Sequence, residues 1–195
     1  MGEFHIDGES LRPEDVLAIA HGQHTVSLSE SSREAMVGSR SAIEQVLDSD
    51  DVVYGINTGF GALSSVRIEL GQLEDLQVNL IRSHACGVGE RMEPEHVLMM
   101  MIIRANSLAK GFSGARPEVV DLLLSMVNAR IAPVVPRIGS LGASGDLAPL
   151  SHMALSLIGE GECTICDEDS WIVMQSSDAL SGAGLSSINL QAKEG

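Results

Sequence analysis

Residues 94–111, PEHVLMMMIIRANSLAKG, constrain the fold more than any other stretch. Apolar side chains cover most sides of this segment when it is drawn as a helix, and such a helix is stable only when other elements surround it. Pro94 suits the first turn of a helix. We therefore expect a buried central helix, in which the methionines at 99–101 pack in the core or in a subunit interface. The apolar run stops at Arg104 and is far shorter than the roughly 20 residues that a bilayer requires.

Apolar periodicity predicts further helices around this one. They cover residues 10–22, 28–51, 69–85, 117–130 and 147–159. The spacing of Ser31 and Glu34 is that of a capping box and predicts the start of the second helix. Leu147, Leu150, Ala154, Leu157 and Ile158 are expected on one face of the last. A brief strand at 52–54 and a hairpin around 167–171 complete a mainly α fold.

The charge balance limits the partners of the chain. Lysine and arginine number 12 against 27 acidic residues, a formal net charge of −15. This argues against nucleic acid or an anionic membrane as the main partner and leaves a small polar substrate open. Three cysteines are too few for a disulfide framework. Cys163 and Cys166 have the spacing of a metal-binding pair, but no second pair accompanies them, so we predict no metal site. The first residues do not read as a secretory signal, and a cytoplasmic location is expected.

A glycine-rich segment at 139–152, GSLGASGDLAPLSH, precedes the last of these helices. In a tight bend the amide nitrogen of Gly145 can reach the carbonyl carbon of Ala143 and close a five-membered ring with loss of water. Ser144 can then lose its hydroxyl as a second water, which leaves a methylidene group conjugated to the ring. Asp146 would cap the following helix, whose positive end favours negative charge at the ring. Taken alone, the tripeptide also fits a flexible connection with a capping residue.

Three segments in order carry a resemblance that spans nearly the whole chain. The segment 139–162, GSLGASGDLAPLSHMALSLIGEGE, resembles the signature of the aromatic amino acid ammonia-lyases. YGINTGFG at 54–61 and NLIRSHACGVGE at 79–90 are similar to two further motifs of that family. The resemblance implies the N-terminal helical domain of the ammonia-lyase (fumarase/aspartase-like) superfamily. It also implies that Ala143, Ser144 and Gly145 become the 4-methylideneimidazol-5-one (MIO) group.

The resemblance also implies roles for other residues. Tyr54, the only tyrosine of the chain, would remove the β-proton of the substrate, and Asp146 would help the tripeptide to cyclise. His84 would contact the substrate or order the site, while Asn57 and Gly59, which we assign to the substrate-binding set, would shape the tyrosine loop. A histidine at this position is similar to the pattern of histidine ammonia-lyases, which release ammonia from L-histidine and form urocanate.

Other readings stay open at this point. The substrate could be tyrosine or phenylalanine, the reaction could be an aminomutation, or the chain could be a noncatalytic module that reuses the fold. We expect residues 1–195 to form a single N-terminal domain that carries the tripeptide. The family's C-terminal helical bundle is absent from the sequence, so we expect a truncated or cleaved fragment that is inactive alone. The resemblance implies a homotetramer for the full-length protein.

Overall fold

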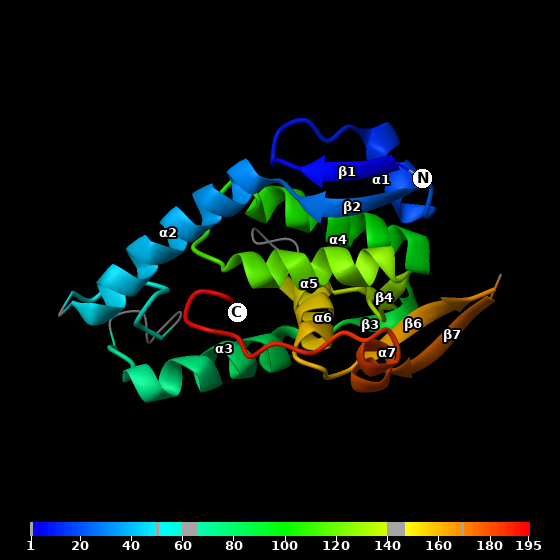
Figure 1. Cartoon of the computed structure of the whole chain (residues 1–195). Helices are drawn as coiled ribbons and strands as arrows, with labels where there is room; N and C mark the ends of the chain where they lie inside the picture. Colours follow the sequence, from blue (N-terminus) through cyan, green and yellow to red (C-terminus); the bar gives the residue numbers. More distant parts are fainter. Residues whose placement is uncertain (1, 50, 60–65, 140–146, 169) are drawn as a thin grey trace.

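The computed structural model describes residues 2–49, 51–59, 66–139, 147–168 and 170–195 (Figure 1). These residues are mainly helical, as predicted. The helices are α1 (Pro13–Ala20), α2 (Glu30–Asp48), α3 (Leu70–His84), α4 (Pro94–Leu108), α5 (Pro117–Asn128), α6 (Leu147–Leu157) and α7 (Ser176–Gly182). The strands are β1 (Gly2–Ile6), β2 (His24–Leu28), β3 (Val88–Arg91), β4 (Ile131–Pro133), β5 (Pro136–Ile138), β6 (Glu162–Asp167) and β7 (Ser170–Gln175).

Helices α4 and α5 lie side by side at the centre of the molecule (Figure 1). α1 packs against α4, and β2 packs against α5. The side chains of α4 that lie in the core are Val97, Leu98, Met101, Ile102, Ala105 and Leu108. The sequence predicts that most sides of this helix are buried. The structure agrees except along one stripe, where Ile103 is 53% exposed. The other exposed residues of the helix, His96, Arg104 and Ser107, lie on the same stripe as Ile103. The helix also ends at Leu108, three residues before the predicted end.

The strands form small sheets at the edges of the helical core. β1 and β2 pair in parallel and are joined through α1. β6 and β7 form the hairpin predicted around residues 167–171, and β4 extends it into an antiparallel sheet. β3 pairs with β5 across a long sequence separation. The strand predicted at 52–54 is wrong: the amides of Ile56 and Asn57 both donate to the carbonyl of Val53, so this segment is a turn.

Helix α2 begins earlier than the capping-box spacing predicts. Ser29 is the N-cap, and its hydroxyl accepts a hydrogen bond of 3.2 Å from the amide of Ser32. Ser31, the predicted cap, lies inside the first turn of the helix and is exposed. Both serines can cap a helix in principle. The backbone of Ser29 is extended, which is the conformation that an N-cap requires.

Gly111, in the connection between α4 and α5, gives a prediction about stability. Its φ is +73°, and an added Cβ would lie 2.7 Å from the carbonyl carbon of Ala35 in α2. Gly111→Ala should therefore lower the free energy of unfolding by about 2 kcal/mol or more, through backbone strain and overpacking. Gly38→Ala is the matched control, because Gly38 is within α2 and an added Cβ meets nothing within 4 Å. It should raise the free energy of unfolding by about 0.5–1 kcal/mol. Urea unfolding measures both, and equal effects would contradict the prediction.

Candidate active site

Tyr54 lies at the start of a turn that is held by hydrogen bonds from two buried side chains, Asn57 and Thr58. The side chain of Asn57 accepts from the amide of Val53 at 2.8 Å and donates to the carbonyl of Asp51 at 2.8 Å. The hydroxyl of Thr58 accepts from the amide of Gly55 and donates to the carbonyl of Gly59. Both bracing side chains are buried, whereas Tyr54 is 61% exposed. The residues after the tyrosine thus use their polar groups to hold the turn.

The turn is closed by a short antiparallel contact with the segment before α3. The amide of Gly59 donates to the carbonyl of Val66 at 3.1 Å, and the amide of Ile68 donates to the carbonyl of Asn57 at 2.9 Å. The side chain of Asn57 and the backbone of Gly59 thus take part in the hydrogen bonds that hold this loop. Their assignment to the substrate-binding set stays a prediction.

His84 is the last residue of α3, and its ring orientation is fixed by the helix. Its Nδ1 lies 2.8 Å from the carbonyl oxygen of Leu80 and 3.0 Å from the hydroxyl of Ser83. A carbonyl oxygen only accepts hydrogen bonds, so Nδ1 carries the proton in the neutral ring. The lone pair is then on Nε2, which can accept a hydrogen bond from a donor in the adjacent space.

Tyr54 and His84 line one cavity of about 500 Å³. Leu147, Leu150 and Ala154, from the first turns of α6, line it as well. Leu157 lines the cavity too, so four of the five residues predicted on one face of α6 do share a face; the fifth, Ile158, lies just after the helix. That face is not fully buried, since Leu147 is 49% exposed. Apolar periodicity places residues on one face of a helix, but it does not show whether that face packs in the core or lines a cavity. Ala143, Ser144, Gly145 and Asp146 lie outside the described residues and directly precede α6.

The end of the chain forms another wall of this cavity, through Lys193, Glu194 and Gly195. The side chain of Glu194 is fully buried and accepts hydrogen bonds from Nε and Nη2 of Arg116, each 2.8 Å long. Arg40, whose side chain is 8% exposed, donates to the carbonyl of Ala192 at 2.9 Å. Two arginines from α2 and the start of α5 thus hold this segment against the core.

Arg104 on α4 lines the cavity, and the sequence does not predict this. In the sequence it is only the residue that ends an apolar run. It lines the 500 Å³ cavity and also a shallower groove of about 330 Å³ beside Met99 and Met100. Arg104 as a whole is exposed, but partial desolvation of its guanidinium group against these walls lowers its pKa from the usual range. The groove places Met99 and Met100 at the edge of the core, as the predicted core or interface packing requires.

The two cysteines of the CTIC segment do not form a metal site in the structure. Cys163 and Cys166 lie three residues apart on β6, so their side chains point to opposite faces of the strand. Burial raises the pKa of the Cys163 thiol, which lies 3.2 Å from the hydroxyl of Ser176. No cluster of three or more His, Cys, Asp or Glu side chains suited to a metal occurs in the described parts of the chain. Among the same residues, no helix has the length and apolar character needed to cross a membrane.

The fold and the cavity define a mainly helical domain with a tyrosine and a histidine on the wall of one apolar site. A family model described as aromatic amino acid lyase matches residues 11–195. The chain belongs to the aromatic amino acid lyase family.

Individual relatives agree with this assignment. The chain is 49% identical over 190 residues to a histidine ammonia-lyase of Geobacillus sp. (strain WCH70), covering 97% of this chain and 37% of that protein. It is 48% identical over 190 residues to a probable histidine ammonia-lyase of Halobacterium salinarum (strain R1), covering 97% of this chain and 35% of the relative. The crystal structure of histidine ammonia-lyase from Trypanosoma cruzi matches with a TM-score of 0.88 and 37% identity, over 98% of this chain and 36% of that one. The chain thus spans a little over one third of the length of these relatives.

Proposed function

We propose that this chain is the N-terminal catalytic domain of a histidine ammonia-lyase, which eliminates ammonia from L-histidine and forms trans-urocanate. One observation carries the proposal: Tyr54, His84 and the first turn of α6, directly after the tripeptide, line the same cavity. Three motifs that are far apart in the sequence thereby surround one space. The relatives named histidine ammonia-lyase support histidine as the substrate.

Tyr54 and His84 have different roles in the proposed reaction: one removes a proton and the other binds the substrate. Tyr54 would act as the general base through its phenolate oxygen, which takes the β-proton of the substrate and becomes the phenol. Nε2 of His84 can accept a hydrogen bond from the N–H of the substrate imidazole, because the other nitrogen is already engaged with Leu80. The leucines and Ile81 give the cavity a largely apolar lining around these two side chains.

The residues at 143–145 fit the MIO group by their chemistry and by their flanks. Glycine supplies an unhindered amide nitrogen, serine supplies a hydroxyl that can leave as water, and alanine is small beside the reacting carbonyl. Leu147, two residues after the tripeptide, lines the cavity. Ala143, Ser144 and Gly145 would therefore hold the group at this cavity, with Asp146 beside it. When formed, the group supplies an electrophile for the α-amino group of the substrate, which makes ammonia a better leaving group.

We further propose that activity requires a longer protein that contains this chain, called here the complete protein. The relatives are nearly three times as long as their matched segment, and the family resemblance implies that a helical bundle supplies further substrate-binding residues. It also implies a cytoplasmic homotetramer. A purified 195-residue species that releases ammonia by itself would overturn the requirement for the longer protein.

The test of the proposed function uses the complete protein with L-histidine, L-tyrosine and L-phenylalanine in parallel. Ammonia and urocanate should appear with L-histidine, and the ultraviolet absorbance separates urocanate from cinnamate-type products. The mass of the tripeptide-containing peptide should be two water molecules lower than that of the open chain. Turnover of tyrosine or phenylalanine alone would overturn the substrate assignment. An open, fully hydrated tripeptide without turnover would instead identify a noncatalytic module.

A further inference from the structure

Both described flanks of the segment 140–146 meet the chain at Gly87. A Cβ added to Gly139, just before that segment, would lie 3.2 Å from the Cα of Gly87 and 2.9 Å from the Cβ of Ala148. A Cβ added to Gly87 would lie 3.2 Å from the Cβ of Pro136 in β5. Gly87 therefore lies close to Pro136 of β5, to Gly139 and to His152 of α6. It follows His84 by three residues.

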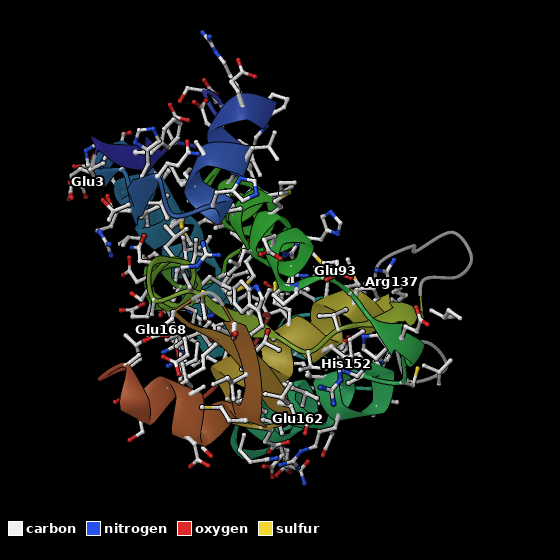
Figure 2. All side chains as sticks on the ribbon, turned by 90° about the vertical axis from the view of Figure 1, so that its right-hand side faces the viewer. Glu3, Glu93, Arg137, His152, Glu162 and Glu168 are labelled. Carbon is white, nitrogen blue, oxygen red and sulfur yellow. The ribbon has the colours of Figure 1, made fainter. Side chains whose placement is uncertain are left out.

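His152 supplies a polar link at this junction. Its Nε2 accepts a hydrogen bond of 3.1 Å from the amide of Gly87. Since Nε2 is the acceptor, the neutral ring carries its proton on Nδ1. Protonation of Nε2 would replace the acceptor with a donor and break the bond. Figure 2 labels His152 on the same face of the molecule as Glu93 and Arg137.

The surroundings favour the neutral form of His152. Burial lowers the pKa of His152 from its ordinary value, and no charged group contributes to this shift. The cations on the packed elements have partners of their own: Arg82 of α3 binds Glu160, and Arg137 of β5 lies 3.3 Å from Glu93. His84 ends α3 and bonds to Leu80, and Cys86 in the connecting segment is exposed.

We propose that His152 is a positioning residue, whose neutral imidazole holds the segment that carries His84 against both flanks of the tripeptide segment. This inference rests on the proposed function for its catalytic consequence, but the link itself is a property of the fold. His84 and the first turns of α6 line the cavity from different elements, so their mutual position depends on such a link. A misplacement of about 1 Å in an active site can cost on the order of 10²-fold in rate.

Two substitutions separate the acceptor from the charge. His152→Gln keeps a hydrogen-bond acceptor near the position of Nε2 and does not titrate between pH 5 and 8. His152→Leu has a similar volume and no acceptor. His96→Gln is the matched control, because His96 lies on the outer groove beside Met99. It should leave every readout below unchanged.

Nuclear magnetic resonance of the 195-residue chain, 20.6 kDa in mass, reads the link without any turnover. As the pH falls from 8 to 5, the amide signals of Gly87 and of its neighbour Cys86 should follow the titration of His152. Both responses should vanish in His152→Gln, which keeps the amide of Gly87 protected from hydrogen exchange. At pH 8, where the bond to the neutral ring is intact in the parent, His152→Leu should lose at least about tenfold in protection of the Gly87 amide. The proposal would be overturned if the amide signal of Gly87 did not change as His152 titrates. It would also be overturned if this amide stayed protected from hydrogen exchange in His152→Leu.

The pH dependence of unfolding gives a second readout. Because the folded-state pKa of His152 is lowered, the unfolded chain binds this proton more readily. Stability is therefore complete above about pH 6.5, the ordinary histidine value, and falls as the pH drops through the folded-state pKa. The fall in the urea midpoint between pH 7 and 5 should be smaller in His152→Gln than in the parent. An equal fall in both would contradict the assignment.

Kinetics of the complete protein test the positioning role. In His152→Leu, kcat should fall by about 10- to 100-fold with a smaller change in KM, and His152→Gln should restore kcat to within about threefold. An unchanged kcat in His152→Leu would overturn the positioning role. If the complete protein releases no ammonia from L-histidine while the Gly87 and Cys86 signals behave as described, the proposed function fails and the link at Gly87 is upheld.

Discussion

Replacing Tyr54 with phenylalanine should lower kcat for ammonia release from L-histidine by about 10²- to 10⁴-fold, the range expected when a general base is lost. The substitution removes only the hydroxyl of a side chain that is 61% exposed, so the urea midpoint should change little. The loss should appear in kcat more than in KM, because the hydroxyl acts on the β-proton during the reaction. Urocanate absorbance under saturating L-histidine measures it in the complete protein.

Val52→Ala is the matched control for Tyr54→Phe. Val52 lies two residues earlier in the same segment and is 54% exposed, and it does not belong to the cavity wall as described. Its truncation should leave kcat within about twofold of the parent. A Tyr54→Phe protein whose kcat stays within about threefold of the parent would exclude Tyr54 as the base.

Glu194→Gln should lower the free energy of unfolding by about 3–5 kcal/mol, the range for breaking a buried ion pair from one side. Its carboxylate is fully buried and accepts hydrogen bonds from the side chain and amide of Arg116 and from the amide of Gln191. A second cation, Arg40, lies 4.0 Å away. The amide of glutamine cannot neutralise either arginine. Urea denaturation of the 195-residue chain measures the loss.

Glu44→Gln is the control for that measurement. Glu44 pairs with the same Arg40 at 3.2 Å, but its side chain is 56% exposed. An exposed i,i+4 pair contributes roughly 0.3–0.5 kcal/mol, so the loss should be of that size. If Glu194→Gln cost no more than Glu44→Gln, the buried network would not anchor the end of the chain.

Local patterns predict the helices well and their environment less well. The spacing of leucines in α3 and the prolines that open α4 and α5 are local signals, and the structure confirms those three helices. Burial depends on what packs against a helix, which periodicity does not contain. For this reason Ile103 is exposed although it continues an apolar run, and Leu147 faces a cavity although it continues a core pattern.

The pairing of strands that are far apart in the sequence is the part of the fold that the sequence does not predict. The pairs β1–β2 and β3–β5 join segments that are far apart, and neither strand of β3–β5 has a clear alternation of apolar and polar residues. At the site, the motifs predict Tyr54 and His84, and the structure places both on one cavity. The motifs do not predict Arg104 or the link from His152 to Gly87, because each depends on a neighbour from another element.

The walls of the cavity also set an order for its formation during translation. Tyr54 leaves the ribosome well before Lys193, Glu194 and Gly195, which close the same space. At about 5–20 residues per second, this interval is on the order of ten seconds. A nascent chain therefore carries its tyrosine turn for seconds before the wall formed by residues 193–195 exists. From the time each of α3, α5 and α6 is made until that wall follows, its apolar surface at this cavity is open to water or to another molecule that binds it.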